Sequence, residues 1–316
     1  MRKISVVIIL LAIAAFGLFI WWQNGIKAPS PANQQESIFV INKGENVREI
    51  GNDLKEAGFI KDPVVFFLYV KKEGIDTEIQ AGSYRLSPSM TLPQVIETLQ
   101  HGTIDVWITI PEGFRAEEIA DVLKDSISSY NDLWIAILKE NEGYLFPDTY
   151  LIPHEAEVEQ VVSIMRNNFN AKIESIGLST NSPNLDRLVT IASLIEREAL
   201  TDEEKSLIAS VIQNRLNSGM ALDIDATLQY IKGKNADGSW WSVPTASDRQ
   251  INSPYNTYRN PGLPPAPIAN PGIAAIQAAL NPSESSYYFY LHDTNGNIHF
   301  SETLEEHNGK VNKYLR

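Results

Sequence analysis

The start of the chain contains an apolar run that a water-soluble fold would have difficulty burying. From Ile4 to Trp22 the sequence ISVVIILLAIAAFGLFIWW carries no charged residue over 19 positions. A helix of this length rises roughly 28 Å, close to the hydrocarbon thickness of a bilayer. The sequence therefore predicts a single N-terminal transmembrane helix over residues 4–22. A cleaved signal peptide is the alternative, but the run is longer than a usual signal core and no small-x-small site follows it before Lys27.

The residues that flank this run predict its orientation. Arg2 and Lys3 precede it, and Trp21 and Trp22 close it. Basic flanks stay on the cytoplasmic side, and tryptophans favour the membrane interface. We therefore expect residues 1–3 in the cytoplasm and the chain after residue 22 outside the cytoplasmic membrane. The polar, proline-containing residues 23–37 are expected to form a tether.

Charge and composition exclude several classes of function. The formal net charge is −13, and no basic run follows the first few residues. Binding to nucleic acid is therefore not expected, because a phosphate backbone requires clustered Lys and Arg. The chain has no cysteine, so a disulfide, a thiolate metal site and a cysteine nucleophile are all excluded. Its five histidines show no HExxH spacing, and it has neither a nucleotide-type glycine loop nor a GxSxG elbow, so we expect no metal and no cofactor.

Residues 38–104 have the pattern of a small domain in the order strand, helix, helix, strand, helix. Asn46 with Glu49 three residues later predicts a capping box at the first helix, and Asp62-Pro63 predicts the start of the second. Small units of this kind serve as glycan-binding LysM modules, so we expect a LysM-like α+β subdomain. The fold alone does not supply the function.

Residues 105–316 are expected to form a larger mixed α/β catalytic domain, which makes the whole chain α+β. Two long helical patterns run through LDRLVTIASLIEREAL and DEEKSLIASVIQNRLNS, and Thr201 with Glu204 suggests a capping box at the second. From MALDIDATLQYI onward the chain is expected to be strand-like or looped. Near the end, YYFYLHD and IHFSET predict a hairpin across the turn TNGN.

Two glutamates lie at the edges of the first long helical pattern. At about 100° per residue, Glu196 falls roughly 80° to one side of the apolar stripe and Glu198 roughly 80° to the other, while Arg197 points away. Ala192 lies four residues before Glu196 and leaves a recess, so the pKa of that carboxyl is expected to be raised. A protonated glutamate suits a general acid. The alternative is that Glu196 is solvated or paired with a Lys or Arg.

Further polar residues can be placed near the same cleft from their pattern. They are Asp223 and Asp225 in LDID, Asp148 in FPDTY, and the cluster Tyr255, Asn256, Thr257 and Tyr258. Each of them also has an ordinary role open to it in a turn, a cap or a strand edge.

Four motifs occur in one order along the chain: EGYLFPDTY, IASLIEREA, VIQNRLNSGMALDIDATLQY and SPYNTYRNPGLPPAPIANPG. Together they resemble the YceG-like endolytic murein transglycosylases, and the resemblance covers nearly the whole chain. It implies a bacterial inner-membrane enzyme that cleaves the β-1,4 bond from N-acetylmuramic acid to N-acetylglucosamine within peptidoglycan strands. The expected product is a 1,6-anhydromuramyl end. The resemblance also implies action on nascent strands to terminate elongation, and contact with peptidoglycan synthases.

The resemblance also implies roles for particular residues. In that family the first glutamate of the IE(K/R)E motif is catalytic, which is Glu196 here. Glu142, Asp148, Tyr255 and Asn256 are implied to lie near the substrate, and Asp225 is expected with them. The implied mechanism uses a single carboxyl as acid and then as base. Two alternatives stay open: a muramidase in which Asp223 or Asp225 is a second carboxyl, and a peptidoglycan-binding scaffold without catalysis.

Overall fold

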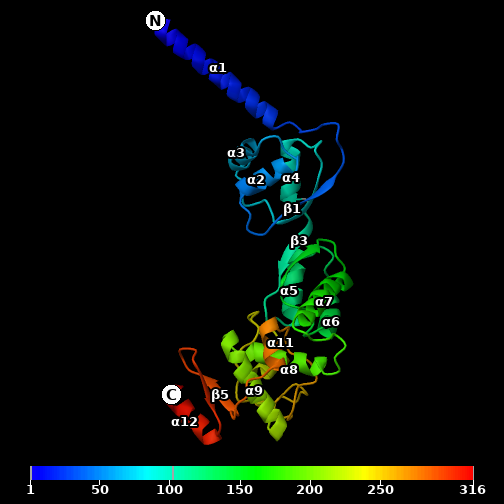
Figure 1. Cartoon of the computed structure of the whole chain (residues 1–316), viewed down its shortest axis with the longest axis vertical. Coiled ribbons are helices and arrows are strands. Elements are labelled where there is room, and N and C mark those ends of the chain that lie inside the picture. Colours follow the sequence, from blue (N-terminus) through cyan, green and yellow to red (C-terminus); the bar gives the residue numbers. More distant parts are fainter. Residues whose placement is uncertain (1, 102, 316) are drawn as a thin grey trace. The chain divides into compact units, whose positions relative to one another are not determined.

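The structure is a computed structural model that describes residues 2–101 and 103–315, with side chains from residue 9 onward except at positions 101 and 103 (Figure 1). The fold is mixed α+β, with twelve α-helices, one short 3-10 helix and two small sheets in these residues. The chain forms two compact units. Unit 1 comprises Met1–Ile108, Ser126–Ser129 and Tyr150–Ala156, and unit 2 comprises Thr109–Asp125, Tyr130–Thr149 and Glu157–Arg316.

Unit 1 contains the predicted small domain. A four-stranded sheet has the order β1-β2-β3-β4, with β1 antiparallel to β2 and β2 antiparallel to β3. The sequence order strand, helix, helix, strand, helix over residues 38–101 is confirmed. The elements are α1 (Arg2–Gly25), β1 (Ser37–Ile41), α2 (Val47–Glu56), α3 (Pro63–Glu73), β2 (Gly82–Leu86), α4 (Leu92–His101), β3 (Thr103–Thr109) and β4 (Thr149–Pro153). Because β4 joins this sheet, unit 1 extends beyond the predicted limits 38–104.

The helix starts in unit 1 follow the sequence signals. Asn46 accepts hydrogen bonds from the backbone of Arg48 and Glu49, and the Glu49 side chain accepts one in return from the Asn46 backbone, so the capping box is confirmed. Asp62 caps α3 with Pro63 in its first turn. Phe66 and Tyr84 are fully buried in the core that these elements share.

The apolar N-terminal run lies within α1, which continues to Gly25. In the part of the chain that the structure describes, no helix is long and apolar enough to cross a membrane. Of the predicted span 4–22, the side chains of residues 4–8 lie outside the described ones, and so does residue 1 of the predicted cytoplasmic end.

Part of the predicted tether, residues 23–37, has contacts within unit 1. Residues 23–25 are helical, and Ala28 is buried. Ser30 donates its backbone N–H to the carbonyl oxygen of Pro88 at 2.9 Å, and Ser87 donates its hydroxyl to the carbonyl oxygen of Asn33 at 3.0 Å. Residues 30 and 33 of this segment are therefore hydrogen-bonded to residues 88 and 87 of unit 1.

Unit 2 is mostly helical. Its elements are α5 (Ala116–Ser126), α6 (Trp134–Glu140), α7 (Val158–Ser175), α8 (Leu185–Glu198), α9 (Asp202–Ser218), α10 (Asp225–Lys232), a 3-10 helix (Asp248–Gln250), α11 (Ile273–Leu280), β5 (Phe289–His292), β6 (Ile298–Ser301) and α12 (Leu304–Tyr314). The predicted hairpin is confirmed as β5–β6. The expectation of strand or loop over MALDIDATLQYI holds for residues 220–224, but it is wrong from Asp225 onward, where α10 begins. Thr227 steadies its first turn by donating to the carbonyl oxygen of Ile224 at 2.7 Å.

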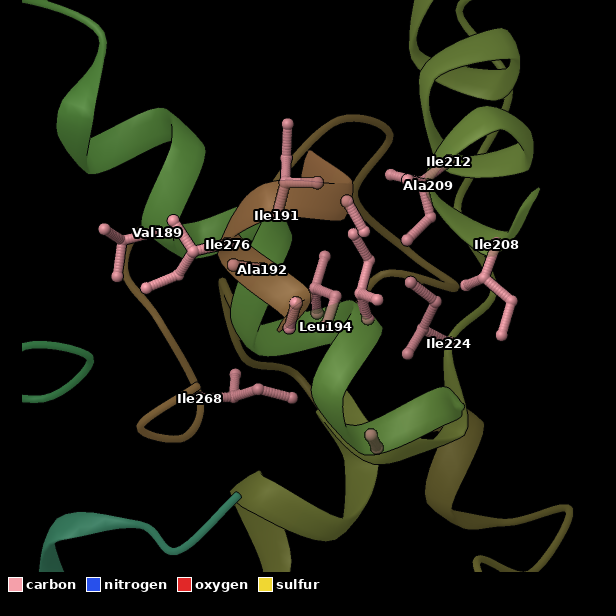
Figure 2. Packing of buried hydrophobic residues seen from close by; sticks show 14 of the residues in the cluster. Val189, Ile191, Ala192, Leu194, Ile208, Ala209, Ile212, Ile224, Ile268 and Ile276 are labelled. Atoms are coloured by element: carbon pink, nitrogen blue, oxygen red, sulfur yellow. The ribbon is translucent and has the colours of Figure 1, made fainter. Parts of the chain in front are cut away.

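The core of unit 2 forms where α8, α9 and α11 pack together. Figure 2 shows Ile191, Ala192 and Leu194 of α8 converging with Ile208 and Ile212 of α9, and all five are buried. This packing confirms the apolar stripe predicted for α8. It also fixes the rotation of the helix, so the two glutamates at its end emerge on opposite sides of the core.

Candidate active site

Glu196 emerges on the side of α9 and α11. Lys205 of α9 lies with its Nζ 3.2 and 3.3 Å from the two carboxyl oxygens of Glu196, and the backbone N–H of Gly272 donates to one of them at 3.0 Å. The Glu196 side chain is 9% exposed and that of Lys205 is 5% exposed. Glu196, which was expected beside an apolar recess, therefore forms a buried ion pair with Lys205. Pairing with a Lys or Arg was the alternative to a raised pKa.

Glu112 lies close to this ion pair, and its position was not predicted. A Cβ placed on Gly272 would fall 1.9 Å from Oε1 of Glu112, so the Glu112 carboxyl packs directly against that glycine. Burial raises the pKa of Glu112, and the negative charge of Glu196 adds to this shift. Glu112 belongs to the turn PEGF, where a single acidic residue gives no periodic signal.

Glu198 emerges on the other side of α8. The hydroxyl of Tyr290, on β5, donates to Oε2 of Glu198 at 2.7 Å. Burial raises the pKa of the Glu198 carboxyl, and the negative charge of Asp225 acts in the same direction, while the Tyr290 hydrogen bond opposes it. A raised pKa was predicted for Glu196, but it is Glu198, on the other side of α8, whose pKa is raised.

Glu198 lines a cavity of about 490 Å³ within unit 2. This volume falls in the range typical of small-molecule and substrate sites. Asp225 lines the same cavity, and its Oδ1 accepts a hydrogen bond of 2.7 Å from the hydroxyl of Tyr258. Two pairs of a carboxyl group and a tyrosine hydroxyl therefore face one space. Such a site can donate a proton to a leaving oxygen and place a second negative group nearby.

Glu142 lies away from this cavity. The residue is 6% exposed, and its carboxyl accepts hydrogen bonds from the backbone N–H of Ala116 at 3.0 and 3.1 Å and from Nδ2 of Asn270 at 2.9 Å. Burial raises its pKa to about 8. Asn270 also accepts from the backbone N–H groups of Gly143 and Leu145. Glu142 thus belongs to a buried network that joins the start of α5 to the segments around residues 142 and 270, and its predicted contact with substrate stays a prediction.

Three other predicted residues also lie outside the lining of the Glu198 cavity. Asp148 pairs with Asn168 and Lys172 of α7, at 3.0 and 3.3 Å. Tyr255 packs on the ring of Tyr230, with centroids 5.1 Å apart. Asn256 is fully buried, and its Nδ2 donates to the carbonyl oxygens of Arg249 and Ile251.

Asn256 forms hydrogen bonds to the backbone of two residues that line the cavity, Arg249 and Tyr258. Its Oδ1 accepts from the backbone N–H of Tyr258, and its Nδ2 holds the carbonyl oxygen of Arg249. Of the residues predicted near the cleft, Asp223, Asp225 and Tyr258 line the cavity together with Glu198. Tyr290 and Arg249 also line the cavity, and sequence reasoning missed both.

Metal ligation has no geometric support in the residues that the structure describes, where no group of three or more His, Asp or Glu side chains could hold an ion.

In this α+β protein, an acid of raised pKa and a second carboxyl therefore line one cavity. A model of the YceG-like family matches residues 39–313, and the chain belongs to that family.

The chain is similar to several named proteins. It is 34% identical over 307 residues to the endolytic murein transglycosylase of Bacillus subtilis strain 168, covering 87% of this chain and 84% of that protein. It is 29% identical over 354 residues to the endolytic murein transglycosylase of Streptococcus pneumoniae strain D39, covering 98% of this chain. The chain spans only 64% of the length of that pneumococcal protein. A crystal structure of a YceG-like protein from Listeria monocytogenes matches with a TM-score of 0.56 and 30% identity, covering 87% of this chain and 99% of that one.

Proposed function

We propose that the chain is a membrane-anchored endolytic lytic transglycosylase. It cleaves the β-1,4 bond from N-acetylmuramic acid to N-acetylglucosamine within peptidoglycan strands and leaves 1,6-anhydromuramyl ends. The observation that carries the proposal is the Glu198 carboxyl, which is bonded to Tyr290 and lines the cavity beside Asp225. The names of the Bacillus and Streptococcus relatives support the same reaction.

The geometry favours Glu198 over Glu196 as the acid. The motif comparison assigns this role to Glu196, which stays a prediction. Glu196, however, accepts hydrogen bonds from Lys205 and from the backbone of Gly272, and it does not line the cavity. Glu198 instead accepts its side-chain hydrogen bond from a neutral tyrosine hydroxyl.

In the proposed reaction Glu198 donates its proton to the glycosidic oxygen as the bond to the anomeric carbon breaks. The Glu198 carboxylate then takes the proton of the muramic C6 hydroxyl, whose oxygen bonds to the same anomeric carbon. One bond is broken, one is formed, and no water is consumed. The negative charge of Asp225 favours the positive charge that develops on the sugar ring.

The membrane anchor is part of the proposal. Residues 4–22 carry no charge, and described apolar side chains of α1 such as Leu11 and Phe16 are exposed at 64% and 65%. So much exposed apolar surface favours a lipid environment. The basic residues before the run favour an N-terminus inside the cell and the chain after residue 22 on the extracytoplasmic side.

Three further roles belong to the same proposal. Unit 1, as a LysM-like module, helps to engage the glycan strand. The enzyme acts on nascent strands to terminate their elongation. Peptidoglycan synthases are its protein partners. All three follow from the motif resemblance to the YceG-like proteins.

Mass spectrometry of digested, uncrosslinked glycan strands tests the reaction. Anhydro ends are lighter than reducing ends by one water, and we expect anhydro ends. Reducing ends alone would replace the lyase with a muramidase in which Asp225 is the second carboxyl.

A scaffold without catalysis predicts that wild type and Glu198→Gln leave the strands equally intact, and that removal of residues 38–103 abolishes localisation.

A further inference from the structure

The end of α1 is packed against α3 of unit 1. The indole N–H of Trp21 donates to Oδ2 of Asp62, the N-cap residue of α3, at 2.8 Å. The ring of Trp22 stacks on that of Tyr69, with centroids 6.3 Å apart and planes 12° from parallel. The apolar helix is therefore in contact with the start and the middle of α3 at the point where its uncharged run ends.

The residues that follow continue this contact. A Cβ placed on Gly25, the last residue of α1, would fall 2.5 Å from Cγ2 of Val65, so the helix backbone lies directly against α3. The carbonyl oxygen of Ile26 accepts the backbone N–H of Leu92 at 3.0 Å, and Ala28 is buried. Packed residues, rather than a free linker, thus join α1 to unit 1.

Apolar side chains are exposed on α3 beside this contact. Val64 is 53% exposed and Leu68 is 42% exposed, and the two lie one helical turn apart. Each directly precedes a residue that contacts α1, namely Val65 and Tyr69. At about 100° per residue, the exposed apolar side of α3 is therefore adjacent to the side that faces α1.

The lysines at the end of α3 already have acidic partners. Lys71 and Lys72, in the last turn, form ion pairs with Asp76 and Glu73. A partner for this side of α3 is therefore attracted by the apolar surface of Val64 and Leu68 more than by charge.

The sequence of α1 indicates which apolar partner is at hand. Residues 4–22 carry no charge, and Trp21 and Trp22 close the run. Tryptophans at the end of a membrane helix favour the headgroup level of the bilayer. Because both tryptophans contact α3, a bilayer that holds them at its interface brings α3 to the same depth. A helix at that depth buries apolar side chains between headgroups and acyl chains, while lysines keep their charged ends in water.

We propose that α3 docks on the membrane that α1 enters, with Val64 and Leu68 inserted into its headgroup layer. The inference rests on the proposed membrane anchor and adds a second membrane contact, made by unit 1 itself. Unit 1 is then fixed at the membrane surface, and a glycan strand that it engages is held close to the bilayer.

Fluorescence quenching in vesicles tests this docking. The chain has no cysteine, so a single introduced cysteine can carry an environment-sensitive fluorophore in the full chain. Phe16→Cys, Leu68→Cys and Ile38→Cys are labelled and reconstituted in vesicles of phosphatidylcholine and phosphatidylglycerol that contain nitroxide lipids, labelled either at the headgroup or in the acyl chain. We expect headgroup nitroxide to quench the label at position 68 severalfold more than the label at position 38. Acyl-chain nitroxide should quench the label at position 16.

Ile38 is the matched control, because it is an apolar residue of unit 1 that is 63% exposed. Its neighbour Phe39 packs into the core that contains Val65 of α3. Since successive side chains of a strand point to opposite faces, Ile38 lies on the face of the sheet away from α3.

A pair of glycine variants tests the packing of α1 on α3. The side chain added by Gly25→Leu would meet Val65, whereas Gly17→Leu, earlier on the same helix, has nothing within 4 Å. Gly25→Leu should lower the quenching at position 68 towards that at position 38, and Gly17→Leu should leave it unchanged. Equal effects of the two variants would contradict this packing.

The labels also separate failure of the docking from failure of the anchor. Equal quenching at positions 68 and 38, with the label at position 16 quenched by acyl-chain nitroxide, would overturn the docking of α3 alone. A label at position 16 that acyl-chain nitroxide does not quench would overturn the proposed membrane anchor instead.

Discussion

The buried carboxyl of Glu142 makes the stability of the protein depend on pH. Burial raises its pKa from 4.5 to about 8 in the folded chain. Because the folded pKa is the higher one, the protonated group contributes stability that is fully present below pH 4.5 and is lost as the pH rises through 8. At 1.36 kcal/mol per pKa unit, a shift of about 3.5 units corresponds to about 5 kcal/mol. The N–H donors of Ala116 and Asn270 favour the ionised form and so oppose the rise in pKa that burial causes.

The substitution Glu142→Gln removes the titration and nearly preserves the shape of the side chain. Urea unfolding of the full chain in detergent, followed by tryptophan fluorescence at several pH values from 4 to 9, gives the free energy of unfolding for both proteins. The difference between them isolates Glu142, because all other groups titrate alike. We expect wild type to lose several kcal/mol relative to Glu142→Gln between pH 5 and 9. Parallel curves for the two proteins would refute the reasoning, and the exposed Glu305→Gln is the control.

Two further predictions concern one glycine and one tyrosine. Gly143 has a φ of +89°, and a Cβ there would lie 2.5 Å from Cγ of Pro267 and 2.9 Å from Cγ1 of Val189, so Gly143→Ala should cost about 3 kcal/mol or more. Gly177 has a φ of +81° with nothing within 4 Å, so Gly177→Ala should cost only about 1–2 kcal/mol, and equal falls in Tm would contradict the packing argument. Tyr290→Phe removes the hydrogen bond that lowers the pKa of Glu198, so the basic limb of the pH–rate profile should move to higher pH. An unchanged or acid-shifted limb would show that Tyr290 does not act on the acid.

Local signals in the sequence were enough to place several elements. The capping box of Asn46 and Glu49 depends on residues three positions apart, and it forms as expected. The apolar stripe of α8 likewise follows from helical period, and it correctly set Glu196 and Glu198 on opposite sides of the core.

Sequence signals predicted the local structure less reliably where tertiary contacts compete with them, as at Thr201 and at α10. Thr201 makes no capping bond, because Glu204 accepts from the backbone of Leu200 at 3.0 Å and faces Nε2 of His292 at 3.1 Å. The strand-like residues from Asp225 onward fold as the short helix α10, and the hydroxyl of Thr257 accepts from the backbone N–H of Ile224 just before it.

The choice between the two glutamates depends on residues far away in the sequence. Helical geometry treats Glu196 and Glu198 as equivalent border positions. Lys205 lies nine residues after Glu196, whereas Tyr290 lies 92 residues after Glu198, on a hairpin whose docking no periodicity predicts. The environment of each acid is therefore a property of the folded unit.

The comparison of Glu198→Gln with Glu196→Gln, assayed on uncrosslinked strands, tests the central claim most directly. Each exchange preserves side-chain shape, and in Glu196→Gln the ammonium of Lys205 keeps Asp202 as a partner at 2.8 Å, so both proteins should fold, as circular dichroism would verify. We predict that Glu198→Gln lowers the cleavage rate by on the order of a hundredfold or more, while Glu196→Gln stays within about tenfold of wild type. Loss of cleavage in Glu196→Gln with activity retained in Glu198→Gln would contradict the account.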